Sequence, residues 1–209
     1  MIHLSRRATS ALAAVTLAAG VVGCSPAAGT PRATQALGAS GCPTTQPAAL
    51  GAGQTRTVTI ATSKGSIAIK IEADLAPIAT GNFVALAACG FYNGLVFHRV
   101  VPGFVIQGGD PNGNGSGGPG YTIADDPVTS AYHRGTVAMA RTSAPHSQGS
   151  QFFIVLSDDA APSLASANTY AILGEVTTGM DAVDAIAADA DAELPSHPIA
   201  MTSVTVATP

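Results

Sequence analysis

The stretch RTVTIATSKGSIAIKIE, residues 56–72, alternates apolar and polar side chains on both sides of a short polar turn. Two sets of apolar residues each share a face: Val58 with Ile60 on one, and Ile67 with Ile69 and Ile71 on another. An alternation with a period of two residues is typical of half-buried strands, and the glycine-containing turn at 63–65 favours an antiparallel connection. The stretch therefore predicts a hairpin with one face in water, and the structured domain is expected to begin near Thr55.

Short strand-like runs and two helical runs follow this hairpin. The strand-like runs occupy residues 95–101, 104–110, 135–141, 150–157, 169–176 and 201–208. Apolar residues at helical spacing favour helices within residues 76–90 and 179–190. Many short strands with two distant helices favour an antiparallel barrel or a sandwich. Because the first and last strands both alternate, we expect them to pair and to close a barrel without an exposed edge.

The N-terminal residues have the composition of an export signal. Basic residues at 6–7 precede an alanine-rich run over 11–22, which is too short and too weakly apolar for a membrane span and fits a secretory signal peptide. The run ends in VVGC, which resembles a bacterial lipobox, although Val21 stands where leucine is usual. The resemblance implies a lipid on Cys24 and anchoring to the extracytoplasmic side of a bacterial membrane. Ordinary cleavage near a chance cysteine is the alternative, and both Sec and twin-arginine export stay open.

The chain is expected to divide into three segments. Residues 1–23 form the signal peptide, the almost uncharged residues 24–54 form a flexible tether, and residues 55–207 form one domain. Two cysteines remain beyond the lipobox, Cys42 and Cys89. Because cysteines outside the cytoplasm often pair, a disulfide between them is predicted, and it would bring the end of the tether onto the domain. The alternative is a buried Cys89 and a free thiol at Cys42.

Composition and spacing argue against several classes of function. The chain carries 9 Lys and Arg against 13 Asp and Glu, with no basic stripe that would favour a nucleic-acid partner. The glycine-rich residues 111–120 lack the Lys-Ser/Thr of a phosphate-binding loop. No His, Cys or Asp spacing matches a metal site, and no G-x-S-x-G elbow indicates a serine hydrolase. We expect no metal and no cofactor, and a monomer that meets the membrane only through its lipid.

Arg99 and Gln107 are unusual residues within the mostly apolar stretch FHRVVPGFVIQGGDP, residues 97–111. Arginine is rarely buried without a partner, and a polar group removed from water costs free energy unless it is hydrogen-bonded. The two side chains therefore either face solvent or occupy a pocket. Strand alternation allows them to converge with aromatic neighbours but does not require it.

The same stretch, followed in order by GSGGPGY, GTVAMAR and GSQFFI, closely resembles the cyclophilins, a family of peptidyl-prolyl cis–trans isomerases. The resemblance runs from about Thr57 to Val206. It implies a mainly β fold, a closed eight-stranded antiparallel β-barrel capped by two α-helices. It also implies that Arg99 and Gln107 are catalytic. The substrate-binding residues that it implies are Phe104, Val105, Ala140, Arg141, Gln151, Phe153, Leu164 and Tyr170.

The chain departs from the family pattern at four positions. Val105 stands where methionine is common, which shortens one apolar wall. Arg141 replaces an asparagine whose contact is largely through the backbone, and Tyr170 replaces a histidine, so that position does not need to titrate. Ser163 lies near the place of the tryptophan found in cyclosporin-sensitive members, and the chain has no Trp, which predicts weak cyclosporin binding.

An isomerase mechanism would explain why an arginine lies in this apolar stretch. Rotation about an X–Pro bond meets a barrier of about 18–20 kcal/mol, and its twisted transition state has a pyramidal nitrogen with a basic lone pair. A fixed cation such as Arg99 can bind that nitrogen only after resonance is broken, and an apolar cradle favours the less polar amide. The expected partners are proline-containing peptides or unfolded exported proteins. The alternative is a proline-peptide-binding chaperone or scaffold with incidental turnover, but Gln107 and Phe153 alongside the arginine favour catalysis.

Overall fold

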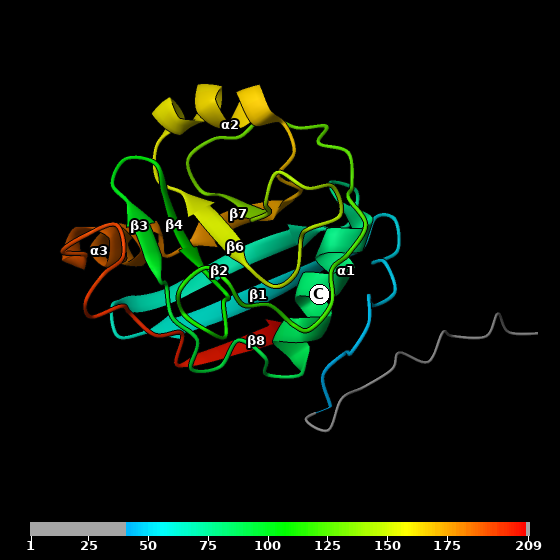
Figure 1. Ribbon diagram of the computed structural model, residues 1–209, viewed down its shortest axis with the longest axis horizontal. Coiled ribbons are helices and arrows are strands. Elements are labelled where there is room, and N and C mark those ends of the chain that lie inside the picture. The colour runs from blue at the N-terminus through cyan, green and yellow to red at the C-terminus, as the bar shows by residue number, and fades with distance from the viewer. Residues whose placement is uncertain (1–40, 208–209) are drawn as a thin grey trace, which may run out of the picture. The chain divides into compact units, whose positions relative to one another are not determined.

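The computed structural model describes residues 41–207, so the expected signal peptide, Cys24 and most of the expected tether lie outside the described residues. In this part of the chain, eight strands form one antiparallel sheet in the order β3-β4-β6-β5-β7-β2-β1-β8, accompanied by three α-helices (Figure 1). The strands are β1 (Thr55–Thr62), β2 (Gly65–Glu72), β3 (Arg99–Val101), β4 (Val105–Gly108), β5 (Thr136–Met139), β6 (Phe152–Val155), β7 (Ile172–Thr178) and β8 (Ser203–Ala207). The helices are α1 (Pro77–Ala88), α2 (Ala161–Ala167) and α3 (Met180–Asp189), with a 3₁₀ turn, η1 (Asp158–Ala160).

The predicted hairpin is confirmed as β1 and β2. Its register places Val58 opposite Ile69 and Ile60 opposite Ile67. The two apolar sets that were expected on separate faces therefore share one face, and their side chains are fully buried. The side chains on this face of the hairpin are part of the main hydrophobic core.

The sheet is open and curled, which corrects the expectation of a closed barrel. The first and last strands do pair, since β1 runs antiparallel to β8 with Val58 opposite Val206. This pairing makes β8 one edge of the sheet, and the other edge is β3. An isolated bridge between Val96 and Ala200, with backbone hydrogen bonds between Met201 and both Gly94 and Leu95, joins the segments that precede these two edge strands.

The free edge of β3 is covered by residues 190–199 instead of by a strand. The backbone N–H groups of Val100 and Phe97 donate to the carbonyl oxygens of Glu193 and Ile199, at 2.8 and 3.0 Å. Two prolines in the covering segment lack the N–H that a regular ladder needs, so it cannot pair as a strand. The segment nevertheless covers hydrogen-bonding groups at the edge of β3, and residues 190–199 therefore lie next to this strand.

In the described part of the chain, three α-helices accompany the sheet where two were expected. The expected helices correspond to α1 and α3, whose apolar residues both join the main core. The additional helix, α2, has only 7 residues and one large apolar side chain, Leu164. Such a short run of small residues shows no helical stripe in the sequence. None of the helices within residues 41–207 has both the length and the apolar character needed to cross a membrane.

Helix α1 begins at Pro77 and depends on another loop for its N-terminal cap. The carboxylate of Asp126 accepts hydrogen bonds from the backbone N–H groups of Ile78 and Ala79, at 3.4 and 2.8 Å. These N–H groups have no partner within the helix, so a distant carboxylate satisfies them and interacts favourably with the helix dipole. The cap therefore fixes the loop at Asp126 to the start of α1.

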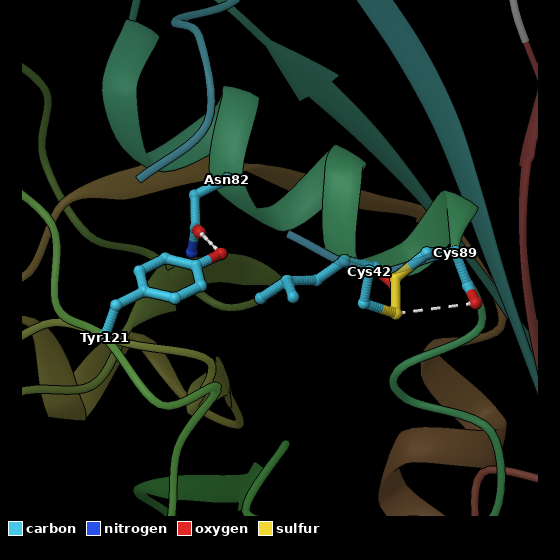
Figure 2. The surroundings of a disulfide bond; sticks show 5 residues. Cys42, Asn82, Cys89 and Tyr121 are labelled. Carbon is cyan, nitrogen blue, oxygen red and sulfur yellow. Dashed lines mark hydrogen bonds between the residues drawn. A yellow bond between two sulfur atoms is a disulfide. The ribbon is translucent and has the colours of Figure 1, made fainter. Parts of the chain in front are cut away.

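The end of the expected tether packs against α1. The structure joins Cys42 to Cys89, just after α1, by a disulfide, which is the pairing expected from the sequence (Figure 2). The N–H of Leu50 donates to the carbonyl of Pro77 at 2.9 Å. A Cβ at Gly81 would lie 2.4 Å from the carbonyl oxygen of residue 48, so only glycine permits this close approach. Residues 42–54 thus form an ordered strap on α1.

Candidate active site

Arg99 and Gln107 meet because they are cross-strand partners. Arg99 on β3 lies opposite Gln107 on β4, and Gln107 lies opposite Phe153 on β6. Directly opposed residues of antiparallel strands place their side chains on the same face of the sheet. The three side chains therefore lie side by side along one face, and the arginine occupies a pocket rim.

An apolar cavity of about 190 Å³ lies on this face. We call it the apolar cavity, and it is lined by Arg99, Phe104, Val105, Gln107, Ala140, Arg141, Phe153, Leu164 and Tyr170. The ring of Phe153 meets that of Tyr170 edge to face, with centroids 5.4 Å apart. Helix α2 contributes Leu164, which is almost fully buried. The cavity is thus an apolar cradle with a guanidinium and an amide at its edge.

A chain of hydrogen bonds runs from the arginine out of the apolar cavity. Arg99 Nη1 donates to Gln107 Oε1 at 3.5 Å, and Gln107 Nε2 donates to Gln151 Oε1 at 2.9 Å. Gln151 Nε2 in turn donates to the carbonyl oxygens of Gly115 and Gly117, at 3.0 and 2.9 Å. Each amide is therefore oriented by its neighbours, and the glycine-rich loop that was expected to be irregular anchors the end of the chain.

A second, larger hollow of about 600 Å³ adjoins the apolar cavity and shares Gln107 and residues 140–141 with it. We call it the glycine-lined cavity, because residues 115–122 form much of its wall. Tyr121 in this wall donates its hydroxyl to Asn82 Oδ1 on α1 at 2.8 Å (Figure 2). Burial raises the pKa of Tyr121 to about 12, so its hydroxyl stays protonated and keeps donating.

Arg141 ties together three loops around the two cavities. Its side chain is only 9% exposed, and its Nη1 lies 3.3 Å from Asp125 Oδ1. Its other contacts are with carbonyl oxygens: Nη2 donates to Ala144 at 2.7 Å, Nε to Thr142 at 3.1 Å and Nη1 to Thr169 at 3.4 Å. The asparagine-to-arginine departure noted in the sequence therefore has a structural consequence, because an asparagine could not span these loops.

Asp125→Asn is expected to make the free energy of unfolding less sensitive to acid. Burial raises the pKa of Asp125, but hydrogen bonds from His146 N–H and the Gln148 side chain, together with the charge of Arg141, hold it below its ordinary value. A carboxylate with a depressed folded-state pKa contributes stability above its unfolded pKa of about 3.9 and loses it as the pH falls through the folded value.

Urea unfolding of the two proteins between about pH 6 and pH 2 measures this contribution. The wild type should be the more stable at neutral pH, and the two stability curves should converge in acid. Parallel curves over the whole range would show that Asp125 contributes no pH-linked stability.

The histidines and serines near the site do not form a nucleophile–base pair within residues 41–207. His98 is buried, its pKa is lowered chiefly by burial, and neither ring nitrogen has a partner among the described residues. Ser150 Oγ donates to the carbonyl of Gly109 at 2.6 Å, and Ser147 Oγ donates to that of Ala144 at 2.7 Å. In the same part of the chain, no group of three or more His, Cys, Asp or Glu could hold a metal ion.

All the catalytic and substrate-binding residues expected from the sequence except Gln151 line the apolar cavity, and Gln151 is one hydrogen bond away from it. Two further residues support the site. Glu193 Oε1 accepts from Arg99 Nε at 2.7 Å, although 94 residues separate them. The hydroxyl of Tyr132 donates to the carbonyl of Tyr170 at 2.9 Å. No sequence pattern marks either residue, because only the folded chain brings them to the site.

The fold and site define a mainly β domain with an apolar cavity that Arg99 and Arg141 both line. The family described as "Cyclophilin type peptidyl-prolyl cis-trans isomerase/CLD" matches residues 57–206. The chain belongs to this family, and it is an enzyme of the peptidyl-prolyl cis–trans isomerase class.

Curated relatives support the assignment. A Helicobacter pylori peptidyl-prolyl cis-trans isomerase is 43% identical over 139 residues, covering 64% of this chain and 81% of the relative. A probable peptidyl-prolyl cis-trans isomerase A of Mycobacterium leprae is 38% identical over 175 residues, covering 73% and 93%.

Solved structures agree with the fold. A Cryptosporidium parvum cyclophilin-type isomerase has a TM-score of 0.68 at 31% identity, covering 74% of this chain and 99% of that one. A second structure of that protein, determined in the presence of the dipeptide Ala-Pro, has a TM-score of 0.66 at 32% identity, covering 73% and 99%.

Proposed function

We propose that this chain accelerates rotation about X–Pro bonds in exported proteins, with Arg99 as the group that stabilises the twisted amide. The observation that carries the proposal is the position of Arg99 at the edge of the apolar cavity, beside Gln107 and Phe153. A cavity built only to bind proline rings would need the apolar wall but not a fixed cation. The guanidinium and the amide are therefore assigned to the reaction.

Arg99 would act on the substrate at the point where resonance is lost. In the planar ground state the prolyl nitrogen has no available lone pair, so a donor gains little from it. In the twisted state the nitrogen becomes pyramidal and accepts a hydrogen bond from the guanidinium. An interaction made only in the transition state raises kcat, since it leaves ground-state binding unchanged. Arginine suits this role because its charge does not titrate near neutral pH.

The apolar cavity would supply a second contribution. A twisted amide is less polar than a planar one, so a site without water favours it. Phe104, Val105 and Leu164 would hold the proline ring. The hydrogen bond from Gln107 to Gln151 would keep the polar edge of the cavity ordered. Because a single preorganised donor is worth roughly 3–4 kcal/mol, desolvation and restraint of the peptide ends must add to it.

Export and lipid anchoring at Cys24 complete the proposal. The Cys42–Cys89 disulfide supports it, because stable disulfides are characteristic of oxidising compartments outside the cytoplasm. Mass spectrometry of the protein from membranes of its host would test it. A mature N-terminus at Cys24 carrying a diacylglycerol mass is expected, and an unmodified cysteine would contradict the anchor.

A protease-coupled assay with a short Ala-Pro peptide tests the activity. Wild-type protein should accelerate the slow phase, which takes tens to hundreds of seconds without catalyst. Binding of the peptide without acceleration would contradict the proposal and favour a proline-peptide-binding chaperone or scaffold.

Cyclosporin is expected to inhibit this activity only weakly. Ser163 is exposed on α2 next to Leu164, near the place where the family resemblance implies a tryptophan in sensitive members. A serine cannot supply the indole N–H donor and the aromatic surface that a tryptophan would offer the ligand. An inhibition constant below about 1 µM in the peptide assay would contradict this prediction.

A further inference from the structure

The guanidinium of Arg99 is held from two sides. Its Nη1 donates to Gln107 Oε1 at 3.5 Å, and its Nε donates to Glu193 Oε1 at 2.7 Å. The second contact is a short, charge-assisted hydrogen bond, which is about twice as strong as a neutral one. Nη2 has no hydrogen-bond partner among the described residues, so it is the donor left for a substrate. The Arg99 side chain remains one-third exposed.

Glu193 is itself fixed relative to β3. Its backbone carbonyl accepts the N–H of Val100, the residue after Arg99, at 2.8 Å. The turn that carries it is closed by Asp191, whose carboxylate accepts both the N–H and the hydroxyl of Ser196. Its carboxylate therefore starts from an anchored backbone, although its side chain is 60% exposed.

Two anchors on different edges of a planar group determine its orientation, whereas one anchor leaves it free to rotate. With Gln107 alone, at 3.5 Å, the guanidinium could swing about its side-chain torsions toward water. The bond to Glu193 removes that freedom and fixes the guanidinium at the edge of the apolar cavity. Groups behind a reacting side chain act in this way in many sites, and their loss typically costs about 10–100-fold when the site is a metal centre.

We propose that Glu193 is a positioning residue for the isomerase reaction, which acts by holding the Arg99 guanidinium in its reactive orientation. The inference rests on the proposed role of Arg99. It assigns a function to the segment 190–199, which otherwise only covers the edge of β3. Because Glu193 acts through Arg99 and does not touch the substrate, its loss lowers kcat and leaves KM nearly unchanged.

Kinetics of Glu193→Ala and Glu193→Gln test the proposal. The alanine variant should lose about five- to tenfold in kcat at unchanged KM and unchanged thermal midpoint, because an exposed ion pair contributes little to stability. The glutamine variant should keep most of the activity, since its amide oxygen still accepts from Nε. Glu175→Ala is the matched control, because it removes an exposed carboxylate from β7 that lines neither cavity.

A double-mutant cycle with Arg99→Ala separates this inference from the proposed function. If Glu193 acts only through Arg99, Glu193→Ala should cause no further loss in the Arg99→Ala background. An equal loss in both backgrounds, or wild-type or raised kcat for Glu193→Ala alone, would overturn the positioning role and leave the role of Arg99 standing. Wild-type kcat for Arg99→Ala would instead overturn the proposed mechanism, and the inference with it.

Discussion

Arg99→Ala is expected to lower kcat/KM for an Ala-Pro peptide by about 10²–10³-fold, which corresponds to the loss of one preorganised donor to the transition state. The expected loss lies in kcat, because in the proposed mechanism the guanidinium binds the prolyl nitrogen only when the amide is twisted. Peptide affinity should change little, since Phe104, Phe153 and Leu164, which line the apolar cavity, are the residues proposed to hold the proline ring. The protease-coupled assay gives the rate, and a titration followed by NMR gives the affinity.

Arg99→Lys is the informative companion variant. Lysine keeps the charge but lacks the fork that bonds Glu193 and Gln107 together, so it should recover only a small part of the activity. Because the Arg99 side chain is partly exposed, both variants should fold with an unchanged thermal midpoint. Near-wild-type kcat in Arg99→Ala would contradict the assignment.

The double substitution Cys42→Ser/Cys89→Ser is expected to lower the free energy of unfolding by about 2–4 kcal/mol. The disulfide closes a segment with a sequence separation of 47, and it restricts the unfolded chain more than the folded one. Contacts of the strap in the folded state should also weaken. The hydrogen bond from the N–H of Leu50 and the close approach at Gly81 both require the strap to lie against α1. Chemical denaturation of the oxidised wild type and the variant measures the difference.

Reduced wild-type protein is the matched control for this variant. It should unfold at nearly the same denaturant concentration as the double serine variant, and reductant should leave the variant itself unchanged. Neither cysteine lines a cavity, so kcat at 25 °C should be unaffected. Equal stability of the oxidised wild type and the variant would show that the strap adds nothing to the domain.

Local sequence patterns predict much of the sheet, but they do not determine whether its two edge strands, β3 and β8, pair to close a barrel. The alternation in residues 56–72 defines the hairpin, since a period of two residues fixes which side chains are buried. Whether β3 meets β8 depends on the segment 190–199, whose prolines prevent regular pairing. Helix α2 was missed because its single large apolar residue, Leu164, gives no period.

The site likewise contains residues that the sequence indicates and residues that only the folded chain brings together. Arg99 and Gln107 could be singled out because they interrupt an apolar stretch, and the resemblance to a family supplied the rest of the cavity wall. Glu193 could not be found, because it is an exposed acidic residue in a loop and only the cover of the β3 edge brings it to Arg99. The interloop contacts of Arg141 likewise appear only when the three loops have been placed.

The proposed function requires that the apolar cavity with Arg99 catalyses X–Pro rotation and does not merely bind proline. Exchange NMR on an Ala-Pro peptide at equilibrium measures both properties in one sample. With a small amount of wild-type protein, cis–trans exchange cross-peaks are expected on a timescale far shorter than the tens to hundreds of seconds of the free peptide. Binding-induced shifts of the peptide signals at the uncatalysed exchange rate would contradict it.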